Sequence, residues 1–576
     1  MLIELLPELR THILSYCCVE DVKNLALTST AYNDTLTQHL YRNIEVSLHN
    51  MVALQLPNQQ QFNDLVHAHT LRVVSGRPFE DVFSSSSSSS SEDRPVPPKE
   101  EKVINYFKEI LPYCSLKGLQ FQCLSSTSGT HSELEITDNM MTVLNSRCPD
   151  LSTLTLDCCD IADAVVPRLQ DFSSLTVLTL RSCLCVTDRG LKYVSELKYL
   201  RNLDIAMNFQ FSDEGLAHLS SLSGLEELDI SACQLLTDRS LQCISTAMPR
   251  LRRLSVASIY NLTDAGISDV ARMPAIRELK LSGLEVLGDR SLPALTQLRS
   301  TIKALDVRIW SRVRAEEILS YVSVLNGLKE LFLGPNKSLS DKGTISSLLS
   351  LSAMPHLRKL DLFFSDVSDE GFAHLSALPL EDLAVCVSTD AALYHISKIA
   401  TLRKLEIRKP HTTWNFSDIG LAHLKNIPCL RDLRFCHHRL SQAMMTRIGA
   451  LVTLTSLCVR GDSAVDDLGL LHLRGMSLSE LDISGNRMVT DKGLLYVSTL
   501  KRLRRLNIGH CPQLSTDGIA HLERLPLLRV LGVSSGGNKY AFDECFRNLV
   551  KNVKIVDSFH GFPLGPLWTI NLPTQS

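Results

Sequence analysis

Three clusters of cysteine and histidine in this sequence have the residue types that bind metal ions. They are Cys158-Cys159, Cys183-x-Cys185 and Cys436-His437-His438. A structural zinc site needs four thiolate or imidazole ligands at workable spacing. Cys159 and Cys183 fall instead at one recurring position of a sequence repeat, which accounts for them without a metal. We therefore expect neither a metal site nor a bound cofactor.

Two common catalytic motifs do not occur in the chain. Because there is no Gly-Lys dipeptide, there is no phosphate-binding loop of the Walker type. His-Glu-x-x-His is missing as well. The sequence is therefore not expected to encode an enzyme.

Side chains that often carry binding energy gather in the middle of the chain. Tryptophan and arginine dominate protein interfaces, with other aromatic residues beside them. We expect such residues to form a contact surface for a protein substrate: Arg308, Trp310, Phe332, Phe363, Arg408, Trp414, Arg434 and Arg460. Trp414, in an extended repeat, is a secondary candidate. Alternatively, Trp310 and Phe363 tuck back between repeats.

The elements that must position these residues come from the pattern Leu-x-x-Leu-x-Leu. About seventeen copies run through the chain, most of them roughly 24 to 26 residues apart. Side chains alternate between the two faces of a strand. In the copy that begins at Leu225, Leu228 and Ile230 therefore point inward, while Glu227 and Asp229 point outward. Each copy predicts a short strand with one buried face.

A second signal follows each strand and predicts a short helix. An example is Thr187-Asp188-x-Gly190-Leu191, in which Thr or Asp caps the helix start by accepting backbone N–H bonds. Between strand and helix, a small polar residue recurs three positions after the last apolar strand residue: Cys159, Cys183, Asn208, Cys233, Asn486 and Cys511. Each repeat is thus a strand, a turn, a helix and a turn.

These repeats resemble the cysteine-containing subfamily of leucine-rich repeats. The resemblance implies an α/β solenoid over residues 116–534, a horseshoe with parallel strands on the concave face and helices on the convex face. Residues 49–115 read as an irregular connector with a disordered Ser/Pro-rich loop at 84–100, and residues 535–576 as a C-terminal cap and tail.

Residues 1–48 contain no repeat and resemble an F-box. The resemblance rests on Leu6-Pro7-Glu8, on Ile13-Leu14-Ser15-Tyr16-Cys17 and on Asp21-Val22. The sequence departs from the family pattern where Glu8 follows Pro7 directly and where Tyr32 stands at the usual tryptophan. The resemblance implies a three-helix domain that binds a Skp adaptor, and through it cullin and RING subunits, with the contact residues Leu6, Pro7, Leu9, Ile13, Leu14, Leu25 and Tyr32. Alternatively, this segment only caps the solenoid.

The charge composition of the chain indicates which kind of partner it binds. A net charge of −3 and a pI of about 6.7 favour neither nucleic acid nor a membrane surface, and the outward strand positions carry acidic and basic groups in near balance. The seventeen cysteines, without a secretory signal, indicate reduced thiols in the cytoplasm or nucleus. The expected function is a substrate-recognition adaptor of a Skp–cullin–F-box ubiquitin ligase. The first alternative is a leucine-rich-repeat scaffold that recruits no ligase. The second is a small-molecule sensor, which would need a deep polar pocket.

Overall fold

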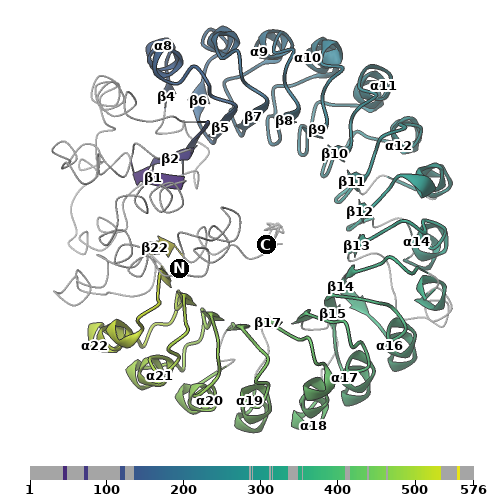
Figure 1. The fold of residues 1–576 in the computed structure, drawn as a ribbon. Helices are drawn as coiled ribbons and strands as arrows, with labels where there is room; N and C mark the ends of the chain where they lie inside the picture. Colours follow the sequence, from purple (N-terminus) through teal and green to yellow (C-terminus); the bar gives the residue numbers. More distant parts are fainter. Residues whose placement is uncertain are drawn as a thin grey trace, which may run out of the picture. The chain divides into compact units, whose positions relative to one another are not determined.

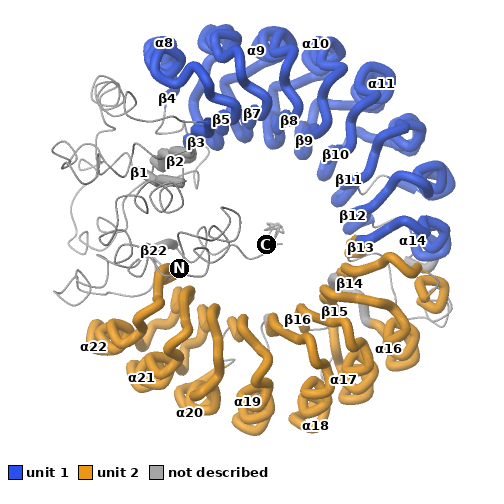
Figure 2. Tube along the Cα trace, viewed as in Figure 1, with its two compact units in different colours: residues 1–78, 87–329 blue, residues 79–86, 330–576 orange. Residues whose placement is uncertain are grey.

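The chain forms two compact units, which Figure 2 shows in different colours. Unit 1 comprises residues 1–78 and 87–329, and unit 2 comprises residues 79–86 and 330–576. Within them, the computed structural model describes residues 43–47, 70–75, 117–123, 135–284, 287–288, 290–310, 313, 315–334, 348–352, 354–408, 416–436, 440–461, 465–533 and 554–557.

The strands of unit 1 pair in parallel, each with the next along the chain, so that equivalent residues lie side by side. Leu203, for example, is in register with Leu228, and Leu228 with Leu254. A short second sheet joins β4 (Glu135–Ile136) to β6 (Asp160–Ile161). The main strands are β1 (Asn43–Ser47), β2 (Thr70–Ser75), β3 (Gly118–Cys123), β5 (Thr153–Asp157), β7 (Val177–Arg181), β8 (Asn202–Asp204), β9 (Glu227–Asp229), β10 (Arg253–Ser255), β11 (Glu278–Lys280) and β12 (Ala304–Asp306).

The helices of unit 1 lie on the outer side of these strands (Figure 1). They are α8 (Asp138–Arg147), α9 (Asp188–Val194), α10 (Asp213–His218), α11 (Asp238–Ala247), α12 (Asp264–Val270), α13 (Ser291–Leu295) and α14 (Ala315–Val322), with the 3₁₀ turns η3 (Val166–Asp171), η4 (Leu219–Ser221) and η5 (Thr296–Ser300).

Unit 2 repeats the arrangement. Its parallel strands are β13 (Glu330–Leu333), β14 (Lys359–Asp366), β15 (Asp382–Cys386), β16 (Lys404–Arg408), β17 (Asp432–Cys436), β18 (Ser456–Arg460), β19 (Glu480–Asp482), β20 (Arg505–Asn507), β21 (Val530–Val533) and β22 (Lys554–Asp557). Its helices are α16 (Asp369–Leu375), α17 (Asp390–Ile396), α18 (Asp418–Ala422), α19 (Gln442–Gly449), α20 (Asp467–Leu471), α21 (Asp491–Val497) and α22 (Thr516–Ala520), with η6 (His423–Asn426) and η7 (His521–Arg524).

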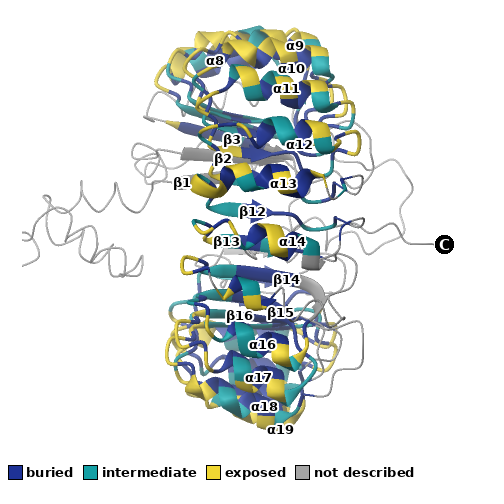
Figure 3. Cartoon of the chain, turned by 90° about the vertical axis from the view of Figure 1, so that its right-hand side faces the viewer, coloured by how far each residue is buried: buried dark blue, intermediate teal, exposed yellow. Residues whose placement is uncertain are grey.

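The core of each unit lies between its strands and its helices, where Figure 3 shows the buried residues. The second and third leucine-type residues of the pattern point inward from every repeat and are almost completely buried, as at Leu228 and Ile230. Burying a leucine or isoleucine side chain contributes about 1.5–3 kcal/mol. Each repeat contributes several such side chains to the core. The apolar periodicity of the sequence predicted these buried positions correctly.

Polar side chains tie each repeat to its neighbour. Asp188, the first residue of α9, accepts hydrogen bonds from the backbone N of Ser212 (2.9 Å) and from its hydroxyl (2.6 Å), one repeat further along the chain. Inside the turn, the Nδ2 of Asn208 donates to the carbonyls of Leu180 (2.7 Å) and Ile205 (2.8 Å), while the Sγ of Cys183 lies 3.4 Å from the carbonyl oxygen of Leu156. The recurring Asp, Asn and Cys therefore satisfy buried backbone groups.

The sheet starts earlier than the expected boundary at residue 116. Strands β1 and β2 precede that residue, and β2 pairs with β3. Strand β1 falls inside the segment 1–48 that was expected to be helical. The expected helices before residue 43, their adaptor-binding residues and the loop 84–100 lie outside the described residues.

Candidate functional site

The outward side chains of the strands form straight rows because the parallel strands pair in register. We call the middle row those residues that stand between the two inward residues of each strand. From β3 to β12 of unit 1 the middle row is Gln120, Thr155, Thr179, Asp204, Asp229, Ser255, Lys280 and Asp306. From β13 to β21 of unit 2 it is Phe332, Asp361, Ala384, Glu406, Arg434, Cys458, Asp482, Asn507 and Gly532.

Aspartates of the middle row have a local structural role. One carboxylate oxygen accepts a hydrogen bond from the backbone N–H two residues later, at 3.0 Å from Asp204 to Ala206 and 2.9 Å from Asp229 to Ser231. Aspartate commonly closes a turn in this way. The bond ends the strand and leaves the second carboxylate oxygen available for other contacts.

Trp310 lies in the core, which corrects the expectation of an exposed ring. Its side chain is 0% exposed, and its indole Nε1 donates a 2.9 Å hydrogen bond to the carbonyl of Leu281. Trp310 stands three residues after Val307, the position that cysteine or asparagine occupies in other repeats. The chain turns back into the core at this point, so the indole replaces the thiol or amide as hydrogen-bond donor.

Arg308 is held by the carboxylate two residues before it. The Nε and Nη2 atoms of Arg308 lie 2.9 and 2.6 Å from the two oxygens of Asp306. Residues i and i+2 of a strand share one face, which permits this bidentate pair. The charge of Arg308 is therefore already matched within the protein.

The expected aromatic contacts have different outcomes. Phe332 is half-buried on the outward face of β13, and the ammonium of Lys359 lies 4.8 Å from its ring centroid. Phe363 belongs to β14, but its side chain lies outside the described residues, as does all of Trp414. Of the predicted aromatic contact residues, Phe332 is therefore the one that the structure describes with a partly exposed side chain.

Arg408 belongs to a buried ionic network and is not an exposed contact. It is 8% exposed, with Nη1 at 2.8 Å from Asp361 and Nε at 2.7 Å from Glu406. Burial opposes the charge, yet the two carboxylates raise the pKa of Arg408 above its ordinary value. Burial also opposes ionisation of Glu406, and Arg408 nevertheless lowers the pKa of that carboxyl. The network fixes β14 and β16 across the strand between them.

The remaining two predicted arginines differ in surroundings. Arg434 pairs with Asp432, with 2.9 Å between Nη2 and Oδ2, and Ser456 donates to the same carboxylate at 3.1 Å. Arg460, at the end of β18, is half-buried. Arg308, Arg408 and Arg434 therefore do not form the free cationic patch that a phosphate group would require.

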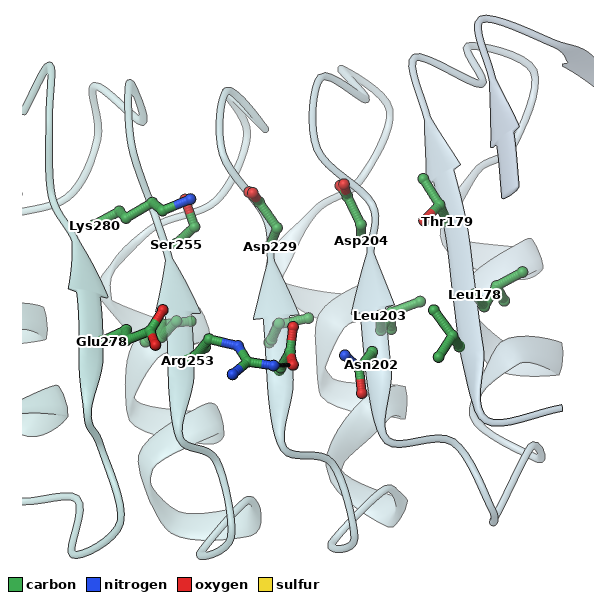
Figure 4. A pocket seen from close by; sticks show the side chains of 14 residues that line it. Leu178, Thr179, Asn202, Leu203, Asp204, Asp229, Arg253, Ser255, Glu278 and Lys280 are labelled. Carbon is green, nitrogen blue, oxygen red and sulfur yellow. Dashed lines mark ion pairs between the residues drawn. The ribbon is translucent and has the colours of Figure 1, made fainter. Parts of the chain in front are cut away.

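A different group of side chains borders a hollow in unit 1, over β7 to β11 (Figure 4). This acidic hollow has a volume of about 340 Å³ and is lined by Asp204, Glu227, Asp229 and Glu278, with Arg253 and Lys280. Arg253 forms an ion pair with Glu227. Carboxylates outnumber cations in the lining, so the hollow favours a positively charged occupant.

Arg181 lies beside the acidic hollow and contacts two of its carboxylates. Its Nη2 is 2.6 Å from Oδ2 of Asp204 and 4.0 Å from Oδ2 of Asp229. Burial raises the pKa of Asp204 above its ordinary value; Arg181 acts in the opposite direction, and the neighbouring Asp229 adds to the rise. The guanidinium of Arg181 thus lies within ion-pair distance of both carboxylates. The outward direction of Glu227 and Asp229 was predicted from the sequence, whereas the approach of Arg181 was not, because it depends on the register between strands.

Three buried thiols of the turns are held in the protonated form. Burial raises the pKa of Cys233 and of Cys511 to about 12, and it raises the pKa of Cys183 as well. A protonated thiol is neither a good nucleophile nor a metal ligand. Within the part of the chain that the structure describes, no group of three or more His, Cys, Asp or Glu residues could hold a metal ion. His437 and His438 lie outside it. The helices within the described ranges include none that is both long and apolar enough to cross a membrane.

Comparison with known families gives two matches. A family model for a leucine-rich repeat region matches residues 152–486, and a leucine-rich repeat model matches residues 476–498. A curated Caenorhabditis elegans protein, named "Putative RNA-binding protein EEED8.10", is 22% identical over 340 residues. That alignment covers 58% of this chain and 41% of the relative, so the chain spans about two fifths of its length.

Comparison with solved structures gives matches of low sequence identity. The yeast complex of Rad7 and Elc1 contains a chain 16% identical, with a TM-score of 0.42, over 65% of this chain and 84% of that chain. An internalin of Listeria monocytogenes is 16% identical, with a TM-score of 0.27, over 81% of this chain and 98% of that chain.

Proposed function

Because the chain belongs to the leucine-rich-repeat family, we propose that it is a non-enzymatic scaffold that binds a protein partner on the outward face of its strands. The observation that carries the proposal is the set of in-register outward rows, in which acidic, basic and apolar side chains mix. Solenoids use such extended surfaces for binding. The mixed charges suit a protein better than a nucleic acid, whose binding groove would be strongly basic.

We propose further that this scaffold is the substrate-recognition subunit of a Skp–cullin–F-box ubiquitin ligase in the cytoplasm or nucleus. Support comes from the F-box-like sequence of residues 5–44, which precedes the repeats. The family models that match cover the repeats and include no F-box model. The name of the Caenorhabditis elegans relative mentions RNA binding. Because the alignment covers 41% of that relative, RNA binding is not proposed for this chain.

The proposed mechanism is proximity. The N-terminal segment would fix the scaffold to the adaptor, and the repeats would hold the substrate near the conjugating enzyme. Tethering raises the effective concentration of the substrate's lysines without bond chemistry in this chain.

Co-expression of the full chain with a Skp adaptor tests the ligase step. Size-exclusion chromatography should show a stoichiometric complex for the wild type, and the Leu6→Ala/Pro7→Ala/Ile13→Ala variant should lose it. An Asp204→Asn/Asp229→Asn variant, changed only in the acidic hollow, serves as the control and should keep the complex. A chain that elutes alone beside the adaptor would contradict the ligase step and leave the scaffold.

A further inference from the structure

Five large apolar side chains are exposed on successive turns of unit 1. They follow strands β7 to β10, and each is between 46 and 56% exposed. We call them the apolar turn row: Leu184, Met207, Phe209, Leu235 and Tyr260. Single exposed apolar residues are ordinary on protein surfaces, but a group of them on adjoining elements marks an interaction site.

Hydrogen bonds between neighbouring turns hold this row in place. The backbone N of Met207 donates to Ser231 (2.8 Å), and that of Ala232 donates to Ala257 (2.8 Å). The side-chain Nε2 of Gln234 donates to the carbonyl of Ser258 at 2.7 Å. The apolar side chains are therefore mounted on an ordered backbone, which reduces the entropy cost of binding a partner.

The acidic hollow adjoins the same turns. Asp204 stands three residues before Met207, and Asp229 stands six before Leu235. Figure 4 shows the two carboxylates side by side at the ends of their strands, where the turns begin. Arg181 lies 2.6 Å from Asp204 and 4.0 Å from Asp229. Negative charge is thus in excess beside an apolar surface.

This combination selects the chemistry of the occupant. The sign of the charge repels phosphate groups and so disfavours nucleic acid and phosphopeptides. A lysine or arginine side chain satisfies the carboxylates, and its apolar neighbours cover the exposed rings and methyl groups. Such an occupant is a protein segment in which a cationic residue is flanked by large apolar residues.

We propose that the apolar turn row and the carboxylates of Asp204 and Asp229 form the docking surface for a partner segment carrying lysine or arginine beside large apolar side chains. This inference rests on the proposed scaffold function and names the partner chemistry of that scaffold. It places the contact in unit 1, at the strand ends, and not at the arginines of unit 2.

Selection of peptides from a random displayed library on the full-length wild-type chain tests the docking surface. Enriched peptides should carry lysine or arginine next to leucine, phenylalanine or similar residues. Fluorescence anisotropy should show about ten-fold weaker binding of those peptides to Asp204→Asn/Asp229→Asn and to Phe209→Ser/Tyr260→Ser, equivalent to about 1.4 kcal/mol each. Asparagine retains the Oδ1 that closes each turn, so the first variant should fold normally.

Tyr199→Ser supplies the matched control, since Tyr199 is 71% exposed and lies outside the docking surface. It should bind the selected peptides as the wild type does. Enrichment of acidic peptides, failure to enrich any sequence, or binding as tight as that of the wild type in both docking-surface variants would overturn the proposal, as would RNA binding that depends on the same four residues. Because the adaptor complex is measured separately, a wild-type chain that forms the adaptor complex but selects no such peptides removes this inference and leaves the proposed ligase function standing.

Discussion

Asp467 and Thr490 join two consecutive repeats through two hydrogen bonds. The backbone N of Thr490 donates to Oδ1 of Asp467 at 2.8 Å, and its hydroxyl donates to Oδ2 at 2.6 Å. Thr490 is also the N-cap of α21, where its hydroxyl oxygen accepts a bond from Lys492. One side chain therefore starts a helix and binds the preceding repeat.

We expect Asp467→Ala to lower the free energy of unfolding by about 1–2 kcal/mol, because both donors of Thr490 lose their acceptor. Asp418 is the control. It occupies the same position in its own repeat but forms an exposed ion pair with Arg447 at 3.2 Å, so Asp418→Ala should cost at most about 1 kcal/mol. Urea denaturation of both variants measures the difference. Equal costs would contradict a stabilising role for the bond between repeats.

Gly493 provides room for the same carboxylate. A Cβ at this position would lie 2.5 Å from Oδ1 of Asp467 and 3.0 Å from Cδ1 of Leu470. Gly493→Ala should therefore destabilise the protein by about 1–3 kcal/mol, despite the better helix propensity of alanine. Gly224→Ala, where the closest atom is a flexible Arg201 nitrogen at 3.3 Å, is the control and should have little effect.

Ser240 shows how a larger residue can occupy the corresponding position. Its hydroxyl donates to the Asp213 carboxylate, and although burial opposes ionisation, hydrogen bonds from Ser240 and Thr237 lower the pKa of Asp213. We therefore expect Gly493→Ser to cost less than Gly493→Ala in the same urea titration. The reverse order would show that space alone decides at this position.

Left-handed backbone recurs just before the buried polar position of the turn. Ala232 has a φ of 59° and Gly485 a φ of 76°, and both precede that position in their repeats. Left-handed backbone costs an L-residue about 1–2 kcal/mol relative to glycine. Ala232→Gly should therefore raise the melting temperature, whereas Gly485→Ala should lower it. A Cβ on Gly485 meets no atom closer than 3.4 Å, so the second change isolates the backbone effect.

The repeat architecture could be predicted from the sequence because each repeat carries its own local signals for the strand and the helix. Apolar spacing marks the strand face, and Ser or Thr before Asp marks the helix start, as at Thr187 and Asp188. The position of Trp310 was predictable by the same counting, since it stands three residues after Val307. Its aromatic character suggested a binding role instead, and the structure shows a core residue.

Contacts between repeats were less accessible to sequence reasoning. Arg408 meets Asp361, which lies 47 residues earlier, because β15 between them presents the small residue Ala384. The exposed Phe209 and Tyr260 lie in turns, whereas most of the predicted contact residues lie on strands or directly after them. An apolar residue directly after the buried turn position would have been the signal for them.

The hydrogen bond of Trp310 should be measurable apart from its packing. Trp310→Phe keeps much of the apolar volume but leaves the Leu281 carbonyl without its donor, so the free energy of unfolding should fall by about 1–3 kcal/mol. Trp310→Ala should cost about 3–5 kcal/mol because it also leaves a cavity. Neither change should alter peptide binding by folded protein. Binding lost in folded Trp310→Phe would restore this residue as a contact candidate.

The ionic network of Arg408 should make stability depend on pH in a defined direction. The pKa of Glu406 is lowered in the folded state from an ordinary value of 4.5: burial opposes the shift, and Arg408 overcomes it. The carboxylate therefore contributes stability above about pH 4.5, and that contribution is lost as pH falls through the lower folded pKa.

Glu406→Gln should cost about 1–3 kcal/mol at pH 7, because Arg408 loses one charged partner and keeps Asp361 at 2.8 Å. The difference between wild type and variant in urea titrations should shrink as the pH is lowered from 5 towards 3. Glu381→Gln, at a half-exposed carboxylate 3.5 Å from Arg403, is the matched control and should show a smaller effect at every pH. A constant difference across this range would mean that Glu406 is not ionised in the folded protein.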